Sequence, residues 1–403
     1  MGRNSRLSNK PFAIVIGLDS INGLRAARTL AYRDIPVIGI AKRPEHYCCR
    51  TNVCTEIIYA ETENEALIHT LKKLGQRLEQ KAVLVPCNDL NVLPISQHRQ
   101  QLDSWYHIVL SDPQVCELLM HKTNFYSFAQ QEGFATPRTF ILKCRHDAEH
   151  AARALTFPCI LKPSVRTEKW ERKLKFKVYK LSTPEDFLSL YDRCGKWYND
   201  LIVQEWVEGS DSNLYTCYCY FSANHEPLVT FVTRKLRQWP PETGEGCLGE
   251  ECRNDIVLQE TVRLFKRVGL RGLGYLEMKR DSKSDRYFII EPNVGRPTSK
   301  SAMAEAGGVE LLYTMYCDAL GWDLPKSRVQ KYGSAKWIFF RRDLQSSYYY
   351  WCRGQLTVGE WWRSLKGKKV DALFSWIDLG PFIGDWFQVF RSIFRPKTWV
   401  SLV

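Results

Sequence analysis

Continuous apolar runs alternate with amphipathic stretches over the first 110 residues. Phe12–Ile16 and 36–40 are apolar throughout, as in strands buried on both faces, and the stretch between them places apolar residues at helical spacing. We expect Asn22 to cap that helix. The strand–helix–strand order predicts a parallel sheet. A later run, KAVLVP, ends shortly before Asp89, which therefore lies at the carboxyl end of a strand, where open α/β sheets bind ligands.

Between about residue 116 and residue 320, strand-like runs are interleaved with helical ones. A helix is predicted after the cap Thr183, with Pro184 as its first residue. The runs LGYLEMKRD and YFIIEPNVG predict a hairpin whose polar turn is 282–285. A helix-rich stretch then closes this part of the chain.

The hairpin carries oxygen-bearing side chains where its apolar runs end. Glu291 and Asn293 are two apart, so in a strand they point to the same face, and Glu277 across the hairpin can join them. Two carboxylates and an amide oxygen are ligands suited to Mg²⁺ held against phosphates. The alternative is a surface hairpin with solvated acids, which we disfavour because both acids follow runs that should be buried.

Lysines at the ends of apolar runs suggest anion binding. Lys162 ends the strand CILK, where a buried ammonium needs an anionic partner such as a phosphate; an ion pair, or an amine that reaches out to solvent, is the alternative. Lys122 and Lys177 are weaker candidates of the same kind. The stretch VQEWVEG, 203–209, leaves its strand at an apolar–acidic link whose backbone can bind an adenine edge; an ordinary edge strand is the alternative.

Five pieces occur in a fixed order: Lys122, ILKP, VQEWVEGSDSNLY, LEMKRD and IIEPNVGRP. Their order and spacing resemble the ATP-grasp superfamily, and within it the predicted carboxylate–amine ligases. The resemblance covers roughly residues 10–320. It implies a parallel α/β domain (1–115), a bilobed α+β ATP-grasp clamp (116–320) and a C-terminal extension (321–403).

The resemblance also implies residue roles. ATP would be bound by Lys122, Lys162, Lys177, Glu205, Val207 and Glu208, and Mg²⁺, with Mn²⁺ as an alternative, by Glu277, Glu291 and Asn293. The catalytic residues would be Arg296, Arg234 and Lys235, and the substrate residues Asp211, Arg237 and Asp89. The sequence departs from the family pattern in two places: Arg296 comes third after the asparagine instead of second, because Gly295 intervenes, and the loop 164–173 has no glycine.

The activity that the resemblance implies is ATP-dependent ligation. ATP phosphorylates a small-molecule carboxylate, and an amine attacks the acyl phosphate, giving an amide, ADP and phosphate. Two other classes are alternatives: a non-catalytic ATP-binding or scaffold protein, and an ATP-grasp carboxylase or phosphotransferase.

The net charge of +13 favours anionic ligands, but it is unevenly spread. Residues 321–403 hold 14 Lys and Arg against 6 Asp and Glu, and no nucleic-acid-binding motif occurs, so no nucleic acid is expected. The 14 cysteines form no C-x-x-C pair, and no apolar run is long enough to span a membrane. We therefore expect reduced thiols, a cytoplasmic location and, by default, a homodimer.

The extension is rich in aromatic residues and holds 8 of the 13 tryptophans. Phe382, Trp386, Phe390 and Ile393 fall on one helical stripe. We favour a helix docked on the body of the protein. Peripheral contact with a membrane is the alternative, because aromatic and basic amphipathic helices lie in bilayer interfaces.

Overall fold

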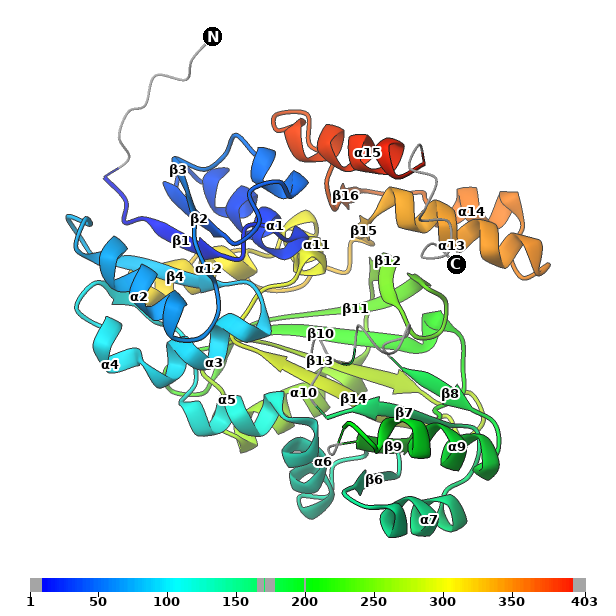
Figure 1. Cartoon of the computed structure of the whole chain (residues 1–403). Helices are drawn as coiled ribbons and strands as arrows, with labels where there is room; N and C mark the ends of the chain where they lie inside the picture. The colour runs from blue at the N-terminus through cyan, green and yellow to red at the C-terminus, as the bar shows by residue number, and fades with distance from the viewer. Residues whose placement is uncertain (1–8, 165–169, 171–177, 199–200, 394–403) are drawn as a thin grey trace.

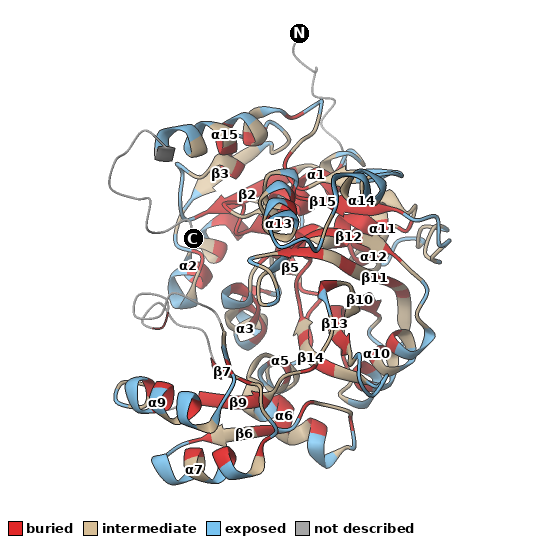
Figure 2. Cartoon of the chain, turned by 90° about the vertical axis from the view of Figure 1, so that its right-hand side faces the viewer, coloured by how far each residue is buried: buried red, intermediate tan, exposed pale blue. Residues whose placement is uncertain are grey.

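Three β-sheets organise the chain (Figure 1). The computed structural model describes residues 9–164, 170, 178–198 and 201–393. The strands of all three sheets form most of the buried interior, and the exposed surface is mainly on the helices and loops (Figure 2).

The N-terminal sheet has the strand order β3-β2-β1-β4-β5, and every neighbouring pair is parallel. Its strands are β1 (Ala13–Ile16), β2 (Val37–Ala41), β3 (Glu56–Tyr59), β4 (Ala82–Pro86) and β5 (Tyr106–His107). The helices around it are α1 (Ile21–Ala31), η1 (Tyr47–Arg50), α2 (Asn64–Gly75), α3 (Asp89–Gln97) and α4 (Arg99–Leu102). Because β1, β2 and β4 are buried on both faces, their sequences are continuously apolar. The predicted parallel α/β domain is confirmed.

The N-terminus of α1 differs from the expectation. Ser20 caps the helix, its Oγ accepting a hydrogen bond from the Gly23 N–H at 3.1 Å, so the prediction of Asn22 as the cap is wrong. A serine two residues earlier already satisfies the helix N-terminus. Asn22 instead accepts a hydrogen bond from the Ser299 N–H at 2.8 Å, which ties α1 to a segment 277 residues away.

The smaller lobe of the clamp is a four-stranded antiparallel sheet in the order β6-β9-β7-β8. Its strands are β6 (Thr139–Leu142), β7 (Cys159–Pro163), β8 (Tyr179–Leu181) and β9 (Leu201–Glu205). The helices of this region are α5 (Pro113–Met120), α6 (Lys122–Gln131), α7 (Arg145–Ala154) and α9 (Pro184–Cys194). Helix α9 begins as predicted, with Thr183 Oγ1 accepting from the Asp186 N–H at 3.1 Å.

The larger lobe is a seven-stranded sheet in the order β14-β13-β10-β11-β12-β15-β16. Its strands are β10 (Leu214–Phe221), β11 (Pro227–Trp239), β12 (Glu245–Glu251), β13 (Gly272–Arg280), β14 (Tyr287–Val294), β15 (Lys336–Ile338) and β16 (Lys369–Asp371). The helices of this part are η2 (Asp211–Asn213), α10 (Asp255–Arg267), η3 (Ser299–Ser301), α11 (Ala302–Ala306) and α12 (Leu311–Ala319). The predicted hairpin is confirmed as β13 and β14, which are antiparallel, with Glu277 directly opposite Glu291.

The C-terminal segment completes this large sheet. β15 pairs antiparallel with β12, and β16 pairs parallel with β15. The remaining helices are α13 (Phe340–Cys352), α14 (Val358–Ser364) and α15 (Gly380–Ile393). Helix α15 packs on η1 of the N-terminal domain, so the segment contacts both the large sheet and the N-terminal sheet (Figure 1).

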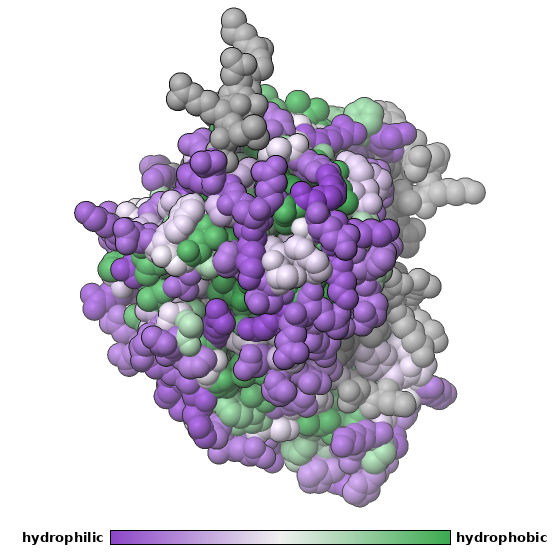
Figure 3. Space-filling model, turned by 90° about the vertical axis from the view of Figure 1, so that its left-hand side faces the viewer, coloured by the Kyte–Doolittle hydropathy of each residue, from purple (hydrophilic) through white to green (hydrophobic). Residues whose placement is uncertain are grey.

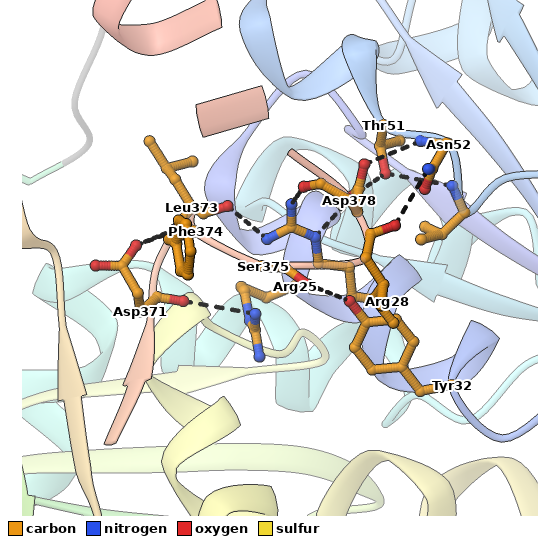
Figure 4. A network of polar contacts seen from close by, with 12 residues as sticks. Arg25, Arg28, Tyr32, Thr51, Asn52, Asp371, Leu373, Phe374, Ser375 and Asp378 are labelled. Atoms are coloured by element: carbon orange, nitrogen blue, oxygen red, sulfur yellow. Dashed lines mark hydrogen bonds and ion pairs between the residues drawn. The ribbon is translucent and has the colours of Figure 1, made fainter. Parts of the chain in front are cut away.

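A buried ion pair joins the C-terminal segment to α1 (Figure 4). Arg28 Nε donates to Asp378 Oδ2 at 2.8 Å, and its other nitrogens donate to the carbonyl oxygens of Leu373 and Asp378 at 2.8 and 2.7 Å. The Thr51 hydroxyl and the Asn52 N–H also donate to the Asp378 carboxylate, at 2.6 and 3.1 Å. Both charges are thus hydrogen-bonded on several sides, which offsets the cost of burying them.

A second buried pair joins the segment to the large sheet. Arg237 on β11 donates from Nε and Nη2 to the two oxygens of Asp343 on α13, at 2.7 and 3.1 Å. The Trp361 indole N–H donates to the same carboxylate at 3.0 Å. The two pairs, Arg28–Asp378 and Arg237–Asp343, are called the seam pairs below.

The thiols, the helix lengths and the surface complete the description. All 14 cysteines are free thiols, as expected. Among the described residues, no helix has both the length and the apolar character that crossing a bilayer requires. On the face that Figure 3 shows, hydrophilic side chains predominate and apolar ones are scattered in small patches between them.

Candidate active site

A cavity of about 540 Å³ lies between the two lobes of the clamp and the N-terminal domain. This volume is in the range of ordinary small-molecule sites. Ten of the residues expected from the sequence line it: Asp89, Lys122, Lys162, Glu205, Val207, Lys235, Glu277, Glu291, Asn293 and Arg296. Residues that are far apart in the sequence are thus brought together at one place.

The two carboxylates face each other across the β13–β14 hairpin, because Glu277 and Glu291 are cross-strand partners. Each is close to a lysine. Lys122 Nζ lies 3.4 Å from Glu291 Oε1, and Lys235 Nζ lies 3.2 Å from Glu277 Oε2. Two carboxylates with an amide on the next same-face position, Asn293, form an oxygen donor set that fits a hard divalent cation such as Mg²⁺.

The extra glycine before Arg296 has a structural explanation. Gly295 has φ +76°, and a Cβ there would lie 2.6 Å from a methyl carbon of Val92, so only glycine fits this turn. After the turn, Arg296 folds back into the cavity. Its Nη2 donates to Asn293 Oδ1 and to Asp89 Oδ2, both at 3.1 Å. Asp89 therefore holds Arg296 beside the predicted metal ligands.

Lys162 is buried at the end of β7, and two of its hydrogen-bond partners are uncharged. Its Nζ donates to Gln204 Oε1 at 3.1 Å and to the Tyr126 hydroxyl at 3.2 Å. Gln204 is held in turn by Thr139, to which its amide donates at 2.7 Å. The sequence analysis missed Gln204 and Tyr126. A glutamine inside the apolar strand LIVQE was the available signal.

The link between the lobes, 205–209, contributes part of the cavity wall. Glu205 Oε1 accepts a hydrogen bond from the Thr156 N–H at 2.9 Å. Val207 lines the cavity, and among the described residues its backbone N–H and C=O make no hydrogen bond. Glu208 is not among the lining residues, and its carboxylate lies 3.5 Å from Lys283 Nζ.

Trp206, also in this link, lies close to two lysines. Lys279 Nζ is 4.3 Å from the centre of its indole ring and Lys180 Nζ is 4.2 Å from it. Burial lowers the pKa of Lys279 to about 8. Trp206 and Lys279 both line the cavity. The sequence analysis identified neither, because nothing in LEMKRD distinguishes Lys279 from a solvent-facing lysine.

Three further expected site residues lie outside the cavity lining. Arg234 pairs with Glu250 at 2.6 Å, and Arg237 belongs to a seam pair. Asp211 is buried, and its carboxylate accepts hydrogen bonds from Gln238 N and Nε2 at 3.1 and 2.8 Å, from Glu242 N at 3.3 Å and from the Tyr350 hydroxyl at 2.7 Å. None of these three residues lines the cavity. Lys177 and most of the loop 164–173 lie outside the described residues.

The C-terminal segment also reaches the cavity, which the sequence analysis did not anticipate. Trp337, Phe339 and Arg342 line it, together with Lys300 that follows β14. The apolar run AKWIFF was the signal for β15, but no local pattern says which sheet a three-residue strand will join.

The comparisons with known proteins agree with this architecture. No protein-family model matches the chain. A D-aspartate ligase from Enterococcus faecium (strain Aus0004) is 24% identical over 264 residues, which is 62% of either chain. The chain thus spans less than two thirds of the length of this curated relative.

Solved structures match more of the chain, at lower identity. The biotin carboxylase domain of Hydrogenobacter thermophilus 2-oxoglutarate carboxylase, in complex with MgADP, ADP and bicarbonate, has a TM-score of 0.62, covering 79% of this chain and 71% of its own at 14% identity. The chain has the ATP-grasp fold. The ATP-grasp neighbours also include N5-carboxyaminoimidazole synthetase from Staphylococcus aureus, with a TM-score of 0.61, 15% identity and 82% of both chains covered. A third is phosphoribosylglycinamide synthetase from Anaerococcus prevotii, with a TM-score of 0.56, 16% identity and 80% and 79% covered.

The predicted ATP-grasp clamp is therefore confirmed. The curated relative is a ligase by name, which is the class that the sequence predicted, and the structural neighbours are synthetases and carboxylases, the latter being the alternative class.

Proposed function

We propose that the protein is an ATP-dependent carboxylate–amine ligase. The observation that carries this proposal is the cross-strand pair Glu277–Glu291, which faces Lys235 and Lys122 in a cavity between two lobes. A triphosphate needs a concentration of positive charge, and carboxylates placed beside lysines can hold a divalent cation against it. The ligase named among the relatives supports the same class.

In this proposal ATP occupies the cavity with its adenine at the link between the lobes. The backbone of Val207 offers a donor and an acceptor for the adenine edge, and Lys162 and Lys122 bind the phosphates. Lys177 and Glu208 stay as predicted contacts to phosphate and ribose. Glu277, Glu291 and Asn293 would hold Mg²⁺ or Mn²⁺, which supplies charge neutralisation at the phosphoryl oxygens.

Two bond-forming steps follow. An oxygen of the substrate carboxylate attacks the terminal phosphorus and ADP leaves, which converts a poor electrophile into an acyl phosphate. The amine nitrogen then attacks the acyl carbon, phosphate leaves, and the nitrogen loses a proton. Lys235 and Arg296, which both line the cavity, would stabilise the negative charge that gathers on the reacting oxygens. Holding the acyl phosphate between the two lobes would limit its hydrolysis by water.

Hydroxylamine trapping tests this function without knowledge of the natural amine. Hydroxylamine converts an acyl phosphate into a hydroxamate, which ferric chloride colours. With ATP, MgCl₂ and a panel of small carboxylic acids, we expect hydroxamate and ADP in equal amounts. ADP formed without hydroxamate, in the presence of bicarbonate only, would instead favour a carboxylase. Nucleotide binding without any turnover would favour the non-catalytic alternative.

For the location of the protein we propose the cytoplasm. Helix α15 docks on the body of the protein, as favoured from the sequence, and contact of its exposed side with an anionic membrane face is the alternative that we propose to test. Fourteen free thiols support a reducing compartment. Helix α15 packs through Phe382 and Asp385, whereas Ile383, Phe387 and Phe390 are each more than half exposed. An exposed apolar stripe on a basic segment suits a bilayer interface.

Vesicle flotation checks this contact. The full chain should float with phosphatidylserine vesicles and not with phosphatidylcholine vesicles. A chain with Ile383, Phe387 and Phe390 all changed to Ser should stay in solution with both. Equal behaviour of the two chains would contradict the contact. The homodimer stays a prediction, which light scattering of the purified chain would check.

A further inference from the structure

The part of the cavity reached by the C-terminal segment gathers positive charge around the start of β12. A Cβ built on Gly246 would lie 3.4 Å from Lys235 Cγ and 3.5 Å from Lys300 Cδ, so both lysines pass alongside this one glycine. Arg342 pairs with the preceding residue, Glu245, at 3.2 Å. All five residues line the cavity. Three cations from β11, η3 and α13 therefore converge on one short stretch of backbone.

One member of this group reaches the reacting centre. Lys235 is the lysine that faces Glu277, 3.2 Å away. The cationic group is therefore continuous with the predicted metal ligands, and a small ligand can touch both. Trp337 and Phe339 line the same cavity and are almost fully buried, so this wall is apolar and firmly packed.

Arg342 is held loosely compared with the arginine beside it. Its partner Glu245 has a side chain that is 72% exposed, and ion pairs with such exposed partners contribute little. Arg341 instead donates to both oxygens of Asp385, at 2.8 Å each, and Asp385 is 4% exposed. Arg342 can thus exchange its partner for a ligand carboxylate at small cost, whereas Arg341 serves to anchor α15.

We propose that Lys300 and Arg342 bind a second carboxylate of the acid substrate, so that the substrate is a small dicarboxylic acid. This inference rests on the proposed ligase function. One carboxylate lies near Lys235, where it is phosphorylated, and the other is bound by Lys300 and the planar guanidinium of Arg342, which suits a carboxylate geometrically. A monocarboxylic acid of the same length leaves these cations without their ligand and binds more weakly.

The test pairs acids that differ in one carboxylate. Hydroxamate formation is measured with succinate against butyrate, and with each enantiomer of aspartate against the same enantiomer of 2-aminobutyrate. We expect kcat/KM for at least one diacid to exceed that of its partner by about tenfold or more, the effect of one good charged contact. In Lys300→Gln and Arg342→Gln this ratio should fall toward one through a higher KM for the diacid, with the KM for ATP unchanged.

Arg341→Gln is the matched control, because Arg341 is the neighbouring residue and is absent from the cavity lining. It should keep the wild-type ratio. A thermal shift with MgADP confirms that each variant is folded and binds nucleotide. Equal turnover of diacids and monoacids by the wild type, or variants that keep the ratio, would overturn the inference and leave the ligase function standing. No hydroxamate from any acid would overturn both.

Discussion

Lys235 and Arg237 are two residues apart on β11, yet their ion pairs differ in kind. Lys235 faces Glu277 in the cavity, where both side chains keep some exposure. Arg237 pairs with Asp343, whose side chain is 0% exposed and whose oxygens also accept from Trp361. The seam pairs are saturated with hydrogen bonds and hold segments together, while the cavity pairs can exchange partners. Burial and hydrogen-bond saturation, more than residue type, separate an ion pair that holds a fold from one that binds a ligand.

The largest effect should come from the cavity pair. Glu291→Gln keeps the shape of the side chain and removes the charge that faces Lys122. Because the carboxylate is proposed to hold the divalent cation, ATP-dependent hydroxamate formation should fall by about 10³-fold, which is about 4 kcal/mol of transition-state stabilisation. The unfolding free energy should change little. Wild-type turnover in this variant would remove Glu291 from the site.

The seam pair Arg237–Asp343 should affect the stability of the fold, in contrast to the cavity pair, which should affect activity. Asp343→Ala leaves the buried Arg237 guanidinium without its carboxylate, and a lone buried charge costs about 3 kcal/mol or more. Urea unfolding should show this loss directly. If the variant is too unstable to purify, Asp343→Asn, which keeps the shape and part of the hydrogen bonding, should show a smaller loss. Unchanged stability in both variants would contradict the comparison.

Lys279 lies between these two kinds, since it is buried in the cavity wall and forms no ion pair with a carboxylate of the described residues. Its pKa, lowered by burial to about 8, returns to its ordinary value of 10.5 in the unfolded chain. Between these values the unfolded state binds more protons, so stability rises with pH through this window, and the charged form costs stability below pH 8. Lys279→Met should raise the unfolding free energy at pH 7 by about 2 kcal/mol, less the lost contact with Trp206.

The pH dependence separates this cause from simple packing. The gain from Lys279→Met should shrink as the pH is raised toward 10, because the wild-type lysine is then neutral in the folded state. Thermal unfolding at pH 7 and pH 9.5 measures the two values. An equal gain in stability at both pH values would show that Lys279→Met acts through packing and not through the charge of the lysine.

The smallest effect is expected at an exposed pair. Arg77 donates to both oxygens of Glu56 at 3.0 Å, but the two side chains are 59% and 39% exposed. Glu56→Ala should lower the unfolding free energy by less than about 1 kcal/mol, and less still at high salt. A loss of unfolding free energy as large as that of Asp343→Ala would show that burial does not determine how much an ion pair contributes to stability.

The sequence predicted those features that depend on local pattern. The parallel sheet followed from apolar runs, and the pairing of Glu277 with Glu291 followed from a hairpin with a short polar turn. The side-chain alternation then placed Asn293 correctly beside them. These predictions succeeded because the spacing of apolar residues and the residue types in a turn are properties of neighbouring residues.

Predictions that depended on a distant partner did not fare as well. Arg237 looked like a substrate residue until Asp343, 106 residues later, accounted for its charge. Asp211 likewise finds Tyr350 from the C-terminal segment. Nothing near either residue signals that partner. The contribution of Trp337, Phe339 and Arg342 was missed for the same reason, since β15 joins β12 across a long stretch of chain.

The place of β15 and β16 in the large sheet has a consequence for biosynthesis. Nearly all charged residues of the cavity have been synthesised by the time residue 300 is added. One edge of β12 nevertheless stays unpaired until residues 336–338 have emerged from the ribosome. A nascent or truncated chain ending near residue 320 would lack part of the cavity wall and would expose β12 as an unpaired edge strand. The cavity wall is therefore complete only once β15 has paired with β12, and a fragment cut near residue 320 should aggregate through the exposed β12 edge.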